Sequence, residues 1–501
     1  MCVVFDNIDV MLGTRSFVKA EVDSRSRLIH VTAASVIYHS PQVKGLGTDR
    51  PVGPLPYTSL FANSSCQQRL VGAICHVAHE VLHPFGHSVL GCGKLEAPSR
   101  PYDFGSLERT RRQALPVYWL EEGKIDDMYV FTKEILGRFR DGTQVHLVGD
   151  CFSLQKLLSV RELLYGENLS VRPDPEDFHV VLVPGWFHLY WNVFLGSLLS
   201  SDRDLLELMI EIGDRRNLKL HKDIGTCFND VDHIATLLLP VVIVRLFRFF
   251  RETVAPAAGV DLSRLPEREV VQRFTLFVVG TVNSLGRATG SGPVTEWQRY
   301  CRVAVLLCVY RSLRVAIATE NHAHMVDALH FSVTLVCQSS FRQYRKVIIE
   351  AVAHFARSSE AEQRKFMQCF TANFSGGHHG GRAVDEVREF DNKAVKEALR
   401  RTHRSEGDLA PELELTERQR EITQVFAAAF RTLETSSGGA VPTLPAPEEV
   451  NALVARAQWP SMLSVLPEKV AKRQMSFFDV ASHVQTVRET LESLFRGDQF
   501  Q

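Results

Sequence analysis

The feature that most constrains the fold is a change in hydrophobic periodicity near residue 185. Before it, short continuous apolar runs are bounded by polar or turn residues, a pattern typical of strands buried in a covered sheet. From residue 186 to about 372, apolar residues recur every three or four positions, which indicates helices. The predicted strands lie at residues 3–10, 28–38, 144–150 and 178–184. The sequence therefore predicts a mixed α/β part followed by an almost entirely helical part.

Helices are also predicted near residues 66–83 and between the last two strands, and the interval 40–115 leaves room for a further strand. The most apolar stretch runs from Ile234 to Val244, eleven residues. Because a membrane-spanning helix needs about 20 apolar residues, this stretch is predicted to be a buried helix, without membrane association. The main predicted helices are 186–200, 203–212, 231–252, 267–287, 295–318, 320–337 and 339–358.

The composition is that of an ordinary globular protein with several domains. The chain has 501 residues, 57 Lys and Arg against 58 Asp and Glu, and a net charge of −1, so any DNA-binding surface requires local clustering of charge. The ten cysteines include no Cys-x-x-Cys pair, which argues against a zinc ribbon or disulfide framework and favours a reducing compartment. No secretory signal, phosphate-binding loop or dinucleotide glycine motif is recognisable, so we expect an intracellular protein without a nucleotide cofactor.

Three acidic residues far apart in the chain have comparable settings. Asp6 lies in the first predicted strand, Asp150 ends the third, and Glu389 lies in a helical segment. Carboxylates at the ends of parallel strands face the crevice where ligands bind, and converging carboxylates can hold two divalent cations. Each acid also has a simpler interpretation. Asp150 suits a helix N-cap and Asp6 a solvent-exposed strand end, while Glu389 can pair with Lys393 one turn later.

The helix that carries Glu389 has a polar face followed by basic residues. Asp385, Glu389, Asn392 and Lys396 are spaced so that they share one face of a helix. Such a row can present a metal ligand beside groups that orient it or the substrate. The basic residues that follow suit contacts with DNA phosphates. They are Lys393, Lys396, Arg400, Arg401 and Arg404.

His188 and Asn192 are one helical turn apart in an aromatic segment that follows the fourth predicted strand. Polar side chains in so apolar a segment need hydrogen-bond partners. They are interpreted either as supporting residues beside the acidic site or as satisfied core residues.

A competing motif lies earlier in the chain. His79, Glu80 and His83 match H-E-x-x-H, in which two histidines bind zinc and the glutamate acts as general base. Pro84 directly follows the second histidine, and position 89, where the longer metzincin signature requires a histidine, is Val89. A zinc peptidase is therefore an alternative, and histidines on a helix surface are the simpler interpretation.

Five short motifs occur in order along the chain. They are Phe5-Asp6-Asn7-Ile8, Gly149-Asp150, Phe187-His188 with Asn192, Phe341-Arg342-Gln343-Tyr344-Arg345-Lys346, and Asp385 with Glu389, Asn392 and Lys396. Together they resemble a family of transposon-derived proteins from fungi and invertebrates known as a domain of unknown function (DUF6589). The likeness covers roughly residues 1–405 and depends on the order and spacing of the motifs.

The resemblance implies an α/β RNase H-like core, a mixed sheet with flanking helices, that is interrupted by a large all-α insertion domain and followed by a helical C-terminal tail. The third acid then returns to the core only after the insertion. The expected parts are the first part of the core at 1–200, the insertion at 201–374, the returning catalytic helix at 375–405, and a C-terminal region at 406–501 with a linker near 435–447.

The resemblance further implies a transposase-like (DDE) protein of a mobile element, which cleaves and joins DNA in the nucleus, as a monomer or homo-oligomer. Asp6, Asp150 and Glu389 would hold two Mg²⁺ or Mn²⁺ ions, with Asp385 as the substitute for Glu389. Two departures leave open a catalytically inactive module that binds DNA or protein. Cys151 replaces an expected polar residue, and no N-terminal zinc-finger module precedes the core, so the chain is expected to be trimmed from a longer parent.

Overall fold

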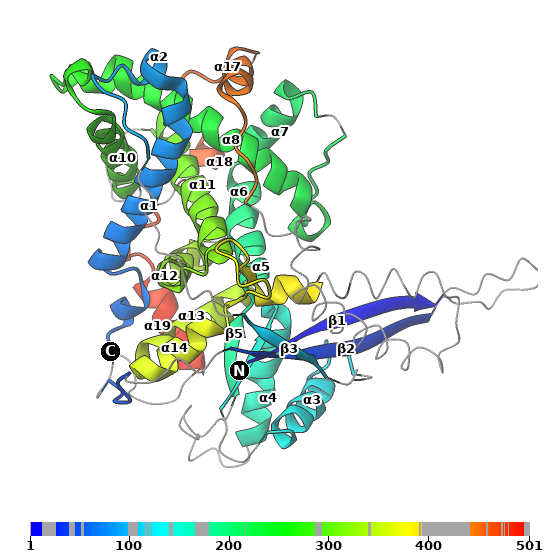
Figure 1. Cartoon of the computed structure of the whole chain (residues 1–501). Helices are drawn as coiled ribbons and strands as arrows, with labels where there is room; N and C mark the ends of the chain where they lie inside the picture. Colours follow the sequence, from blue (N-terminus) through cyan, green and yellow to red (C-terminus); the bar gives the residue numbers. More distant parts are fainter. Residues whose placement is uncertain are drawn as a thin grey trace, which may run out of the picture. The chain divides into compact units, whose positions relative to one another are not determined.

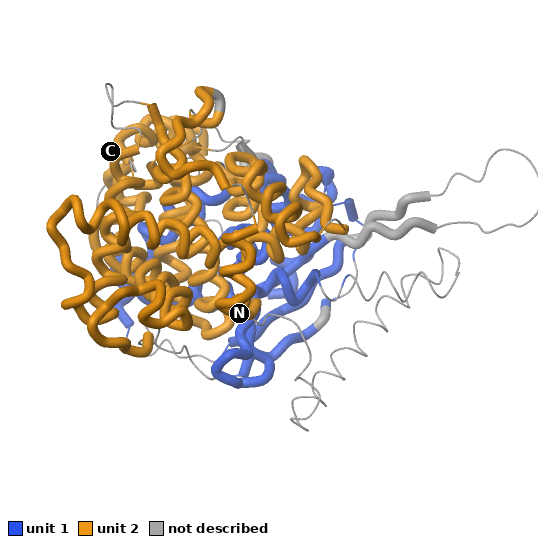
Figure 2. Tube along the Cα trace, turned by 90° about the horizontal axis from the view of Figure 1, so that it is seen from above, with its two compact units in different colours: residues 1–53, 106–189, 346–439 blue, residues 54–105, 190–345, 440–501 orange. Residues whose placement is uncertain are grey.

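The computed structural model divides the chain into two compact units (Figure 2). Unit 1 consists of residues 1–53, 106–189 and 346–439, and unit 2 of residues 54–105, 190–345 and 440–501. With short interruptions, the structure describes residues 2–12, 27–39, 46–51, 55–98, 109–165, 180–285, 293–389, 392 and 441–494. Both units are therefore built from segments that lie far apart in the sequence.

Unit 1 contains a five-stranded mixed sheet (Figure 1). Its strands are β1 (Cys2–Leu12), β2 (Arg27–Tyr38), β3 (Arg111–Ala114), β4 (Val145–Gly149) and β5 (Val180–Pro184). Their spatial order is β3-β2-β1-β4-β5. The first three strands pair antiparallel, whereas β4 runs parallel to both β1 and β5. The four predicted strands are confirmed, and β3 falls within the interval that left room for another.

Helices α3 (Ile125–Gly137) and α4 (Cys151–Tyr165) pack against each other in unit 1. The ring of Phe5 in β1 lies 5.1 Å from that of Phe131 in α3, so the odd-numbered side chains of this part of β1 face α3. Side chains alternate between the two faces of a strand. Asp6 therefore points to the opposite face of the sheet.

The last described segment of unit 1 reaches that opposite face, where Asn392 contacts Asp6 and Arg388 contacts Ser35. Helices α13 (Arg342–Arg357) and α14 (Glu360–Gln368) precede a small hairpin of β6 (Thr371–Ala372) and β7 (Arg382–Ala383). A helical segment at 384–389 begins directly after β7. The hairpin thus fixes the start of the segment that carries Asp385 and Glu389, since the N–H of Val384 also donates to the carbonyl of Phe370 at 3.2 Å.

Unit 2 is helical in all of its longer described elements (Figure 1). Helix α11 is buried along almost its whole length and packs against α1, α8, α10 and α12. The longer helices are α1 (Ser64–Leu82), α7 (Arg203–Ile212), α8 (Phe228–Phe249), α10 (Glu267–Ser284), α11 (Glu296–Ala318), α12 (His322–Gln338), α17 (Pro447–Arg456) and α19 (Val484–Leu494). The predicted helices between residues 186 and 358 are confirmed, with ends that shift by a few residues.

The units do not follow the predicted linear division. Residues 54–105 were expected in the first part of the core, but they belong to unit 2. The physical reason is the apolar face of α1, whose buried side chains pack against α10, α11 and α12. Residues 346–374, expected in the insertion, belong instead to unit 1. The predicted C-terminal linker and the basic stretch at 393–404 lie outside the described residues.

One described helix is apolar and long enough to cross a membrane by composition alone, the stretch from Phe228 to Ala257. In the structure, 72% of its most apolar window is buried inside the protein. Burial at this level is what the core helix of a compact unit shows. The prediction that the stretch from Ile234 to Val244 forms a buried helix is confirmed, since these residues lie in α8 and its side chains there are mostly buried.

Candidate active site

Asp6 lies within β1, and Asp150 directly follows β4, the neighbouring strand that runs parallel to it. Val4 of β1 is paired with Val148 of β4, and Asp6 and Asp150 each lie two residues beyond this pair. Because the side-chain period of a strand is two residues, both aspartates continue the face on which Val4 and Val148 lie. The chain register therefore brings the two carboxylates to one edge of the sheet.

Asp150 also caps α4. Its Oδ1 atom accepts a hydrogen bond from the backbone N–H of Ser153 at 2.7 Å, and its carbonyl accepts from Leu154 at 3.0 Å. This is the N-cap interpretation that the sequence left open, and one carboxylate oxygen is sufficient for it. The cap fixes the orientation of the carboxylate at the end of β4.

Electrostatics shows that the third acid lies near the first two. The pKa of Asp6 is raised to about 7, mainly by burial and then by the negative charges of Glu389 and Asp150. His188 and Arg388 act in the opposite direction. Three carboxylates thus share one region of unit 1, where their mutual repulsion disfavours full ionisation in the absence of a counter-charge.

Asp385 contacts the residues that surround these three carboxylates. It is buried, and it accepts hydrogen bonds from the backbone N–H groups of Phe187 and His188, both at 3.0 Å. These donors belong to the first turn of α5 (Trp186–Leu189), so Asp385 caps a helix far away in the sequence. Its other partner is Nδ1 of His188 at 3.0 Å. Both oxygens of Asp385 are therefore engaged, and they hold His188 and the first turn of α5 in place.

His188 links two acids of the helical segment 384–389. Its Nδ1 atom bonds Asp385, and its Nε2 atom lies 3.3 Å from Oε1 of Glu389. Burial alone would lower the pKa of His188, but hydrogen bonds to Asp385 and Glu389 raise it well above its usual value. The two carboxylates thus favour the protonated form of the imidazole, which lies within ion-pair distance of Glu389.

Two of the groups beside Asp6 come from the same helical region as Glu389. The Nδ2 atom of Asn392 donates to Oδ2 of Asp6 at 2.5 Å, as its position on the predicted polar face allows. Arg388 was not predicted. It is buried, its Nη1 atom donates to Oγ of Ser35 at 3.5 Å, and its charge lowers the pKa of Asp6. No spacing rule singles out an arginine adjacent to the polar face, so only the tertiary fold reveals it.

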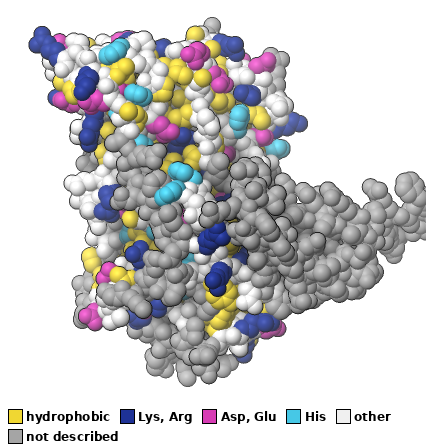
Figure 3. All heavy atoms as spheres, viewed as in Figure 1, with side chains coloured by type: hydrophobic (Ala, Val, Ile, Leu, Met, Phe, Trp, Pro, Cys, Tyr) yellow, Lys and Arg dark blue, Asp and Glu magenta, His cyan; other side chains and the backbone are white. Residues whose placement is uncertain are grey.

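The remaining predicted residues either belong to unit 2 or lie outside the described residues. Asn192 lies in a π-helical stretch, Tyr190–Leu195, that belongs to unit 2. The basic residues Lys393, Lys396, Arg400, Arg401 and Arg404 lie outside the described residues. On the face shown in Figure 3, basic and acidic side chains of the described part are interspersed.

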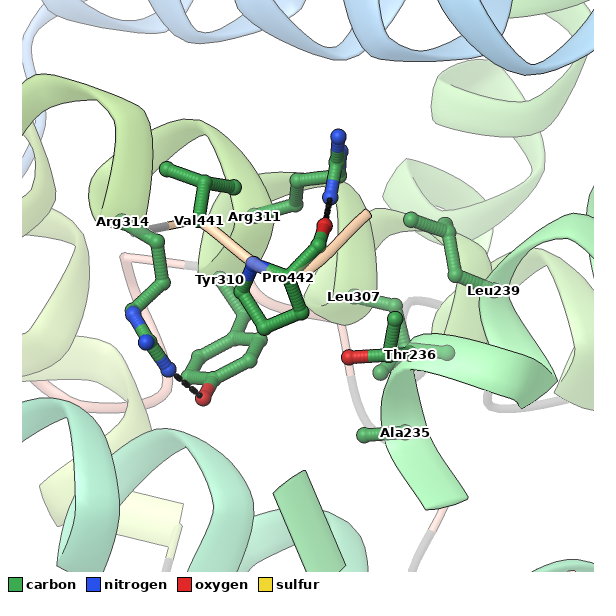
Figure 4. A pocket seen from close by; sticks show the side chains of 9 residues that line it. All are labelled: Ala235, Thr236, Leu239, Leu307, Tyr310, Arg311, Arg314, Val441 and Pro442. Carbon is green, nitrogen blue, oxygen red and sulfur yellow. Dashed lines mark hydrogen bonds between the residues drawn. The ribbon is translucent and has the colours of Figure 1, made fainter. Parts of the chain in front are cut away.

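Unit 2 contains two further polar groupings. His79 and His83 converge with Glu267, and this set could hold a metal ion, whereas Glu80 pairs with Arg311. A pocket lies beside α8 and α11 (Figure 4) and is lined by residues of both helices with Val441 and Pro442. Its two arginines are already engaged. Arg311 donates to the carbonyl of Pro442 at 2.8 Å, and Arg314 pairs with Asp232 at 3.1 Å.

The site of unit 1 thus combines acids on two parallel strands with an acid on a returning helix, each oriented by a neighbouring group. Such a carboxylate set can bind divalent cations, which prefer oxygen ligands. A comparison of the chain with known protein families, characterised proteins and solved structures found no match. The function is therefore inferred from the geometry of the site.

Proposed function

We propose that unit 1 is an RNase H-like core of transposase type, which cleaves and joins DNA phosphodiester bonds with two divalent cations, Mg²⁺ or Mn²⁺. The ligands would be Asp6, Asp150 and Glu389. The observation that carries the proposal is the common register of the two aspartates on β1 and β4, together with the influence of Glu389 on the pKa of Asp6.

The topology of the sheet supports the same proposal. Three antiparallel strands are followed by two strands parallel to the first, in the order β3-β2-β1-β4-β5. This is the arrangement expected of an RNase H-like core, with one acid on the first strand and one after the fourth. The third acid comes from a helical segment that follows the helical unit in the sequence, as the resemblance to transposon-derived proteins implies.

Each residue would have a distinct role in the reaction. Asp6, Asp150 and Glu389 would hold the two cations, whose chemistry when bound would be to activate a water or 3′-hydroxyl and to stabilise the leaving oxygen. Asn392 holds the carboxylate of Asp6 and His188 that of Glu389. Asp385 fixes His188. The basic residues that follow in the sequence, among them Lys396 and Arg400, would contact DNA phosphates and set its position.

The decisive variant is Asp150→Asn. Asparagine is as good an N-cap as aspartate, so α4 keeps its cap while the site loses one negative charge and a strong metal ligand. We expect metal-dependent nicking of supercoiled DNA to fall by roughly 10³-fold or more. Asp126→Asn is the matched control, because Asp126 is an exposed carboxylate on α3 of the same unit. Nicking by Asp150→Asn at the rate of the wild-type protein would refute the proposal.

Measurements of metal binding and of DNA nicking together distinguish an active nuclease core from a catalytically inactive one. Calorimetric titration of the wild-type protein with Mn²⁺ should show binding that is weakened by both Asp150→Asn and Glu389→Gln, and is unchanged by Asp126→Asn. Binding without nicking would favour the alternative of a catalytically inactive module derived from a transposase. Absence of carboxylate-dependent binding would contradict the two-metal site itself.

A further inference from the structure

Two histidines and a glutamate converge inside unit 2, apart from the acids of unit 1. His79 lies in the last turn of α1, His83 begins a 3-10 turn directly after it, and Glu267 is the first residue of α10. The Nε2 atom of His79 lies 3.1 Å from Oε1 of Glu267, and Nδ1 of His83 lies 3.0 Å from the same oxygen. Within the part of the chain that the structure describes, these three ligand atoms alone fall within 4.8 Å of one another.

The burial of this group demands compensation. Glu267 is 0% exposed and His79 only 7% exposed. A carboxylate removed from water needs a counter-charge or several hydrogen bonds. Nε2 of His79 lies 3.1 Å from Oε1 of Glu267 but makes no hydrogen bond among the described residues. This buried nitrogen and the carboxylate oxygen are therefore placed so that both could bind the same metal cation.

The distances fit a transition metal. At zinc–ligand bonds of 2.0–2.1 Å, neighbouring ligand atoms of a tetrahedral site lie about 3.3 Å apart. The separations of 3.0 and 3.1 Å around Oε1 of Glu267 therefore need to open by only a few tenths of an ångström. Imidazole nitrogens select zinc and similar metals over Mg²⁺ or Ca²⁺. We propose that His79, His83 and Glu267 bind one structural Zn²⁺ ion.

The surroundings of Glu267 indicate what the ion would hold together. Its Oε2 atom accepts a hydrogen bond from the N–H of Glu96 at 2.7 Å, which orients the carboxylate. Its own N–H donates to the carbonyl of Lys94 at 2.9 Å, and the N–H of Gly93 donates to Leu265 at 2.9 Å. The ion would therefore tie the end of α1 and the extended segment 93–96 to the beginning of α10.

The same contacts argue for a structural and against a peptidase site. In a zinc peptidase the glutamate of H-E-x-x-H serves as general base beside the metal-bound water. Here Glu80 is held by Arg311, with Oε1 2.8 Å from Nη2. Three protein ligands leave the fourth position of a tetrahedral ion to water on the side of His83, whose side chain is 35% exposed. With Glu80 held by Arg311, that water would lack the general base that a peptidase requires.

The test is the metal content of the full-length protein. Wild-type protein is loaded with Zn²⁺, desalted, and measured by inductively coupled plasma mass spectrometry. We expect close to one zinc per chain, a rise of the melting temperature with Zn²⁺ and a fall with chelator. Glu267→Gln and His79→Gln should each lower zinc occupancy at least tenfold. Co²⁺ substitution of the wild-type protein gives a second readout that does not depend on the folding of a variant. We expect the visible absorption bands typical of four-coordinate Co²⁺.

Matched controls separate this site from its neighbours. Glu80→Gln and His87→Ala alter charged or imidazole groups on the same stretch and should keep the zinc. Asp150→Asn should also keep it, which distinguishes failure of this proposal from failure of the nuclease proposal. Wild-type protein that retains no zinc and gives no cobalt bands would overturn the assignment. Retention of zinc by folded Glu267→Gln, or its loss in any control, would overturn it as well.

Discussion

At the scale of single residues, the candidate active site depends on one glycine. Gly185 precedes α5, and a Cβ atom at this position would lie 2.5 Å from Cγ of Asp385 and still nearer to Oδ2. Its φ is not in the left-handed region, so the requirement is one of space. Only glycine lets the Asp385 carboxylate reach the first turn of α5 and hold His188.

We therefore predict that Gly185→Ala destabilises unit 1 by about 1–3 kcal/mol, the usual range for overpacking. It should also weaken Mn²⁺ binding, because His188 loses the partner that positions it. The matched control is Gly137→Ala at the end of α3, where an added Cβ meets nothing within 4 Å. Chemical denaturation and calorimetry measure both effects. Equal stability of the two variants would contradict the packing argument.

At the scale of elements, the start of α14 is anchored by an ion pair. Glu362 completes a capping box with Ser359, and its carboxylate accepts two hydrogen bonds from Arg50, at 2.5 and 3.0 Å. Burial alone would raise the pKa of Glu362, but the hydrogen bonds from Arg50 and Ser359 lower it to about 2. A segment near residue 50 is thereby fixed to a helix more than 300 residues later.

This ion pair predicts a pH dependence. Because the folded-state pKa of Glu362 lies below its usual 4.5, its contribution is complete above pH 4.5 and is lost as the pH falls towards 2. Glutamine keeps the capping box, so Glu362→Gln isolates the effect of charge. We expect the variant to be less stable by about 1–2 kcal/mol near pH 7, with a difference that shrinks below pH 4.5.

Denaturant unfolding at several pH values measures this difference for unit 1. A double-mutant cycle with Arg50→Met should show that most of the effect depends on the arginine. A stability difference that stays constant from pH 7 to pH 3 would show that the carboxylate charge is not its cause.

At the scale of the whole molecule, the two proposed metal sites lie in different units. Asp6, Asp150 and Glu389 all belong to unit 1, whereas His79 and Glu267 belong to unit 2. Sites without shared residues behave additively. The two sites also differ in chemistry, since one offers carboxylates and the other imidazole nitrogens.

We therefore predict that the two sites can be removed independently. Glu267→Gln should leave Mn²⁺ binding and DNA nicking within about twofold of the wild-type values, while Asp150→Asn should leave zinc content unchanged. The double variant should show the sum of the two single effects. Calorimetry and metal analysis on the same preparations test this, and loss of Mn²⁺ binding in folded Glu267→Gln would show that the sites are coupled.

The secondary structure of most described elements follows from local patterns in the sequence. Apolar runs identified β1, β2, β4 and β5, and three- and four-residue spacing identified the helices of unit 2, because local burial patterns follow the periods of strands and helices. The sequence also singled out Asp6, Asp150, His188, Asp385 and Glu389 as polar residues in settings that call for partners.

Which of these residues come into contact depends on the tertiary fold. The pairing of β1 with β4 aligned Asp6 with Asp150, and the return of the chain after unit 2 brought Glu389, Arg388 and Asn392 to them. Likewise, Glu267 lies beside His79 and His83 although almost 200 residues separate them in the chain, and the local motif contains only Glu80. These contacts join segments that are distant in the sequence, and the hydrophobic periodicity of a single segment does not predict them.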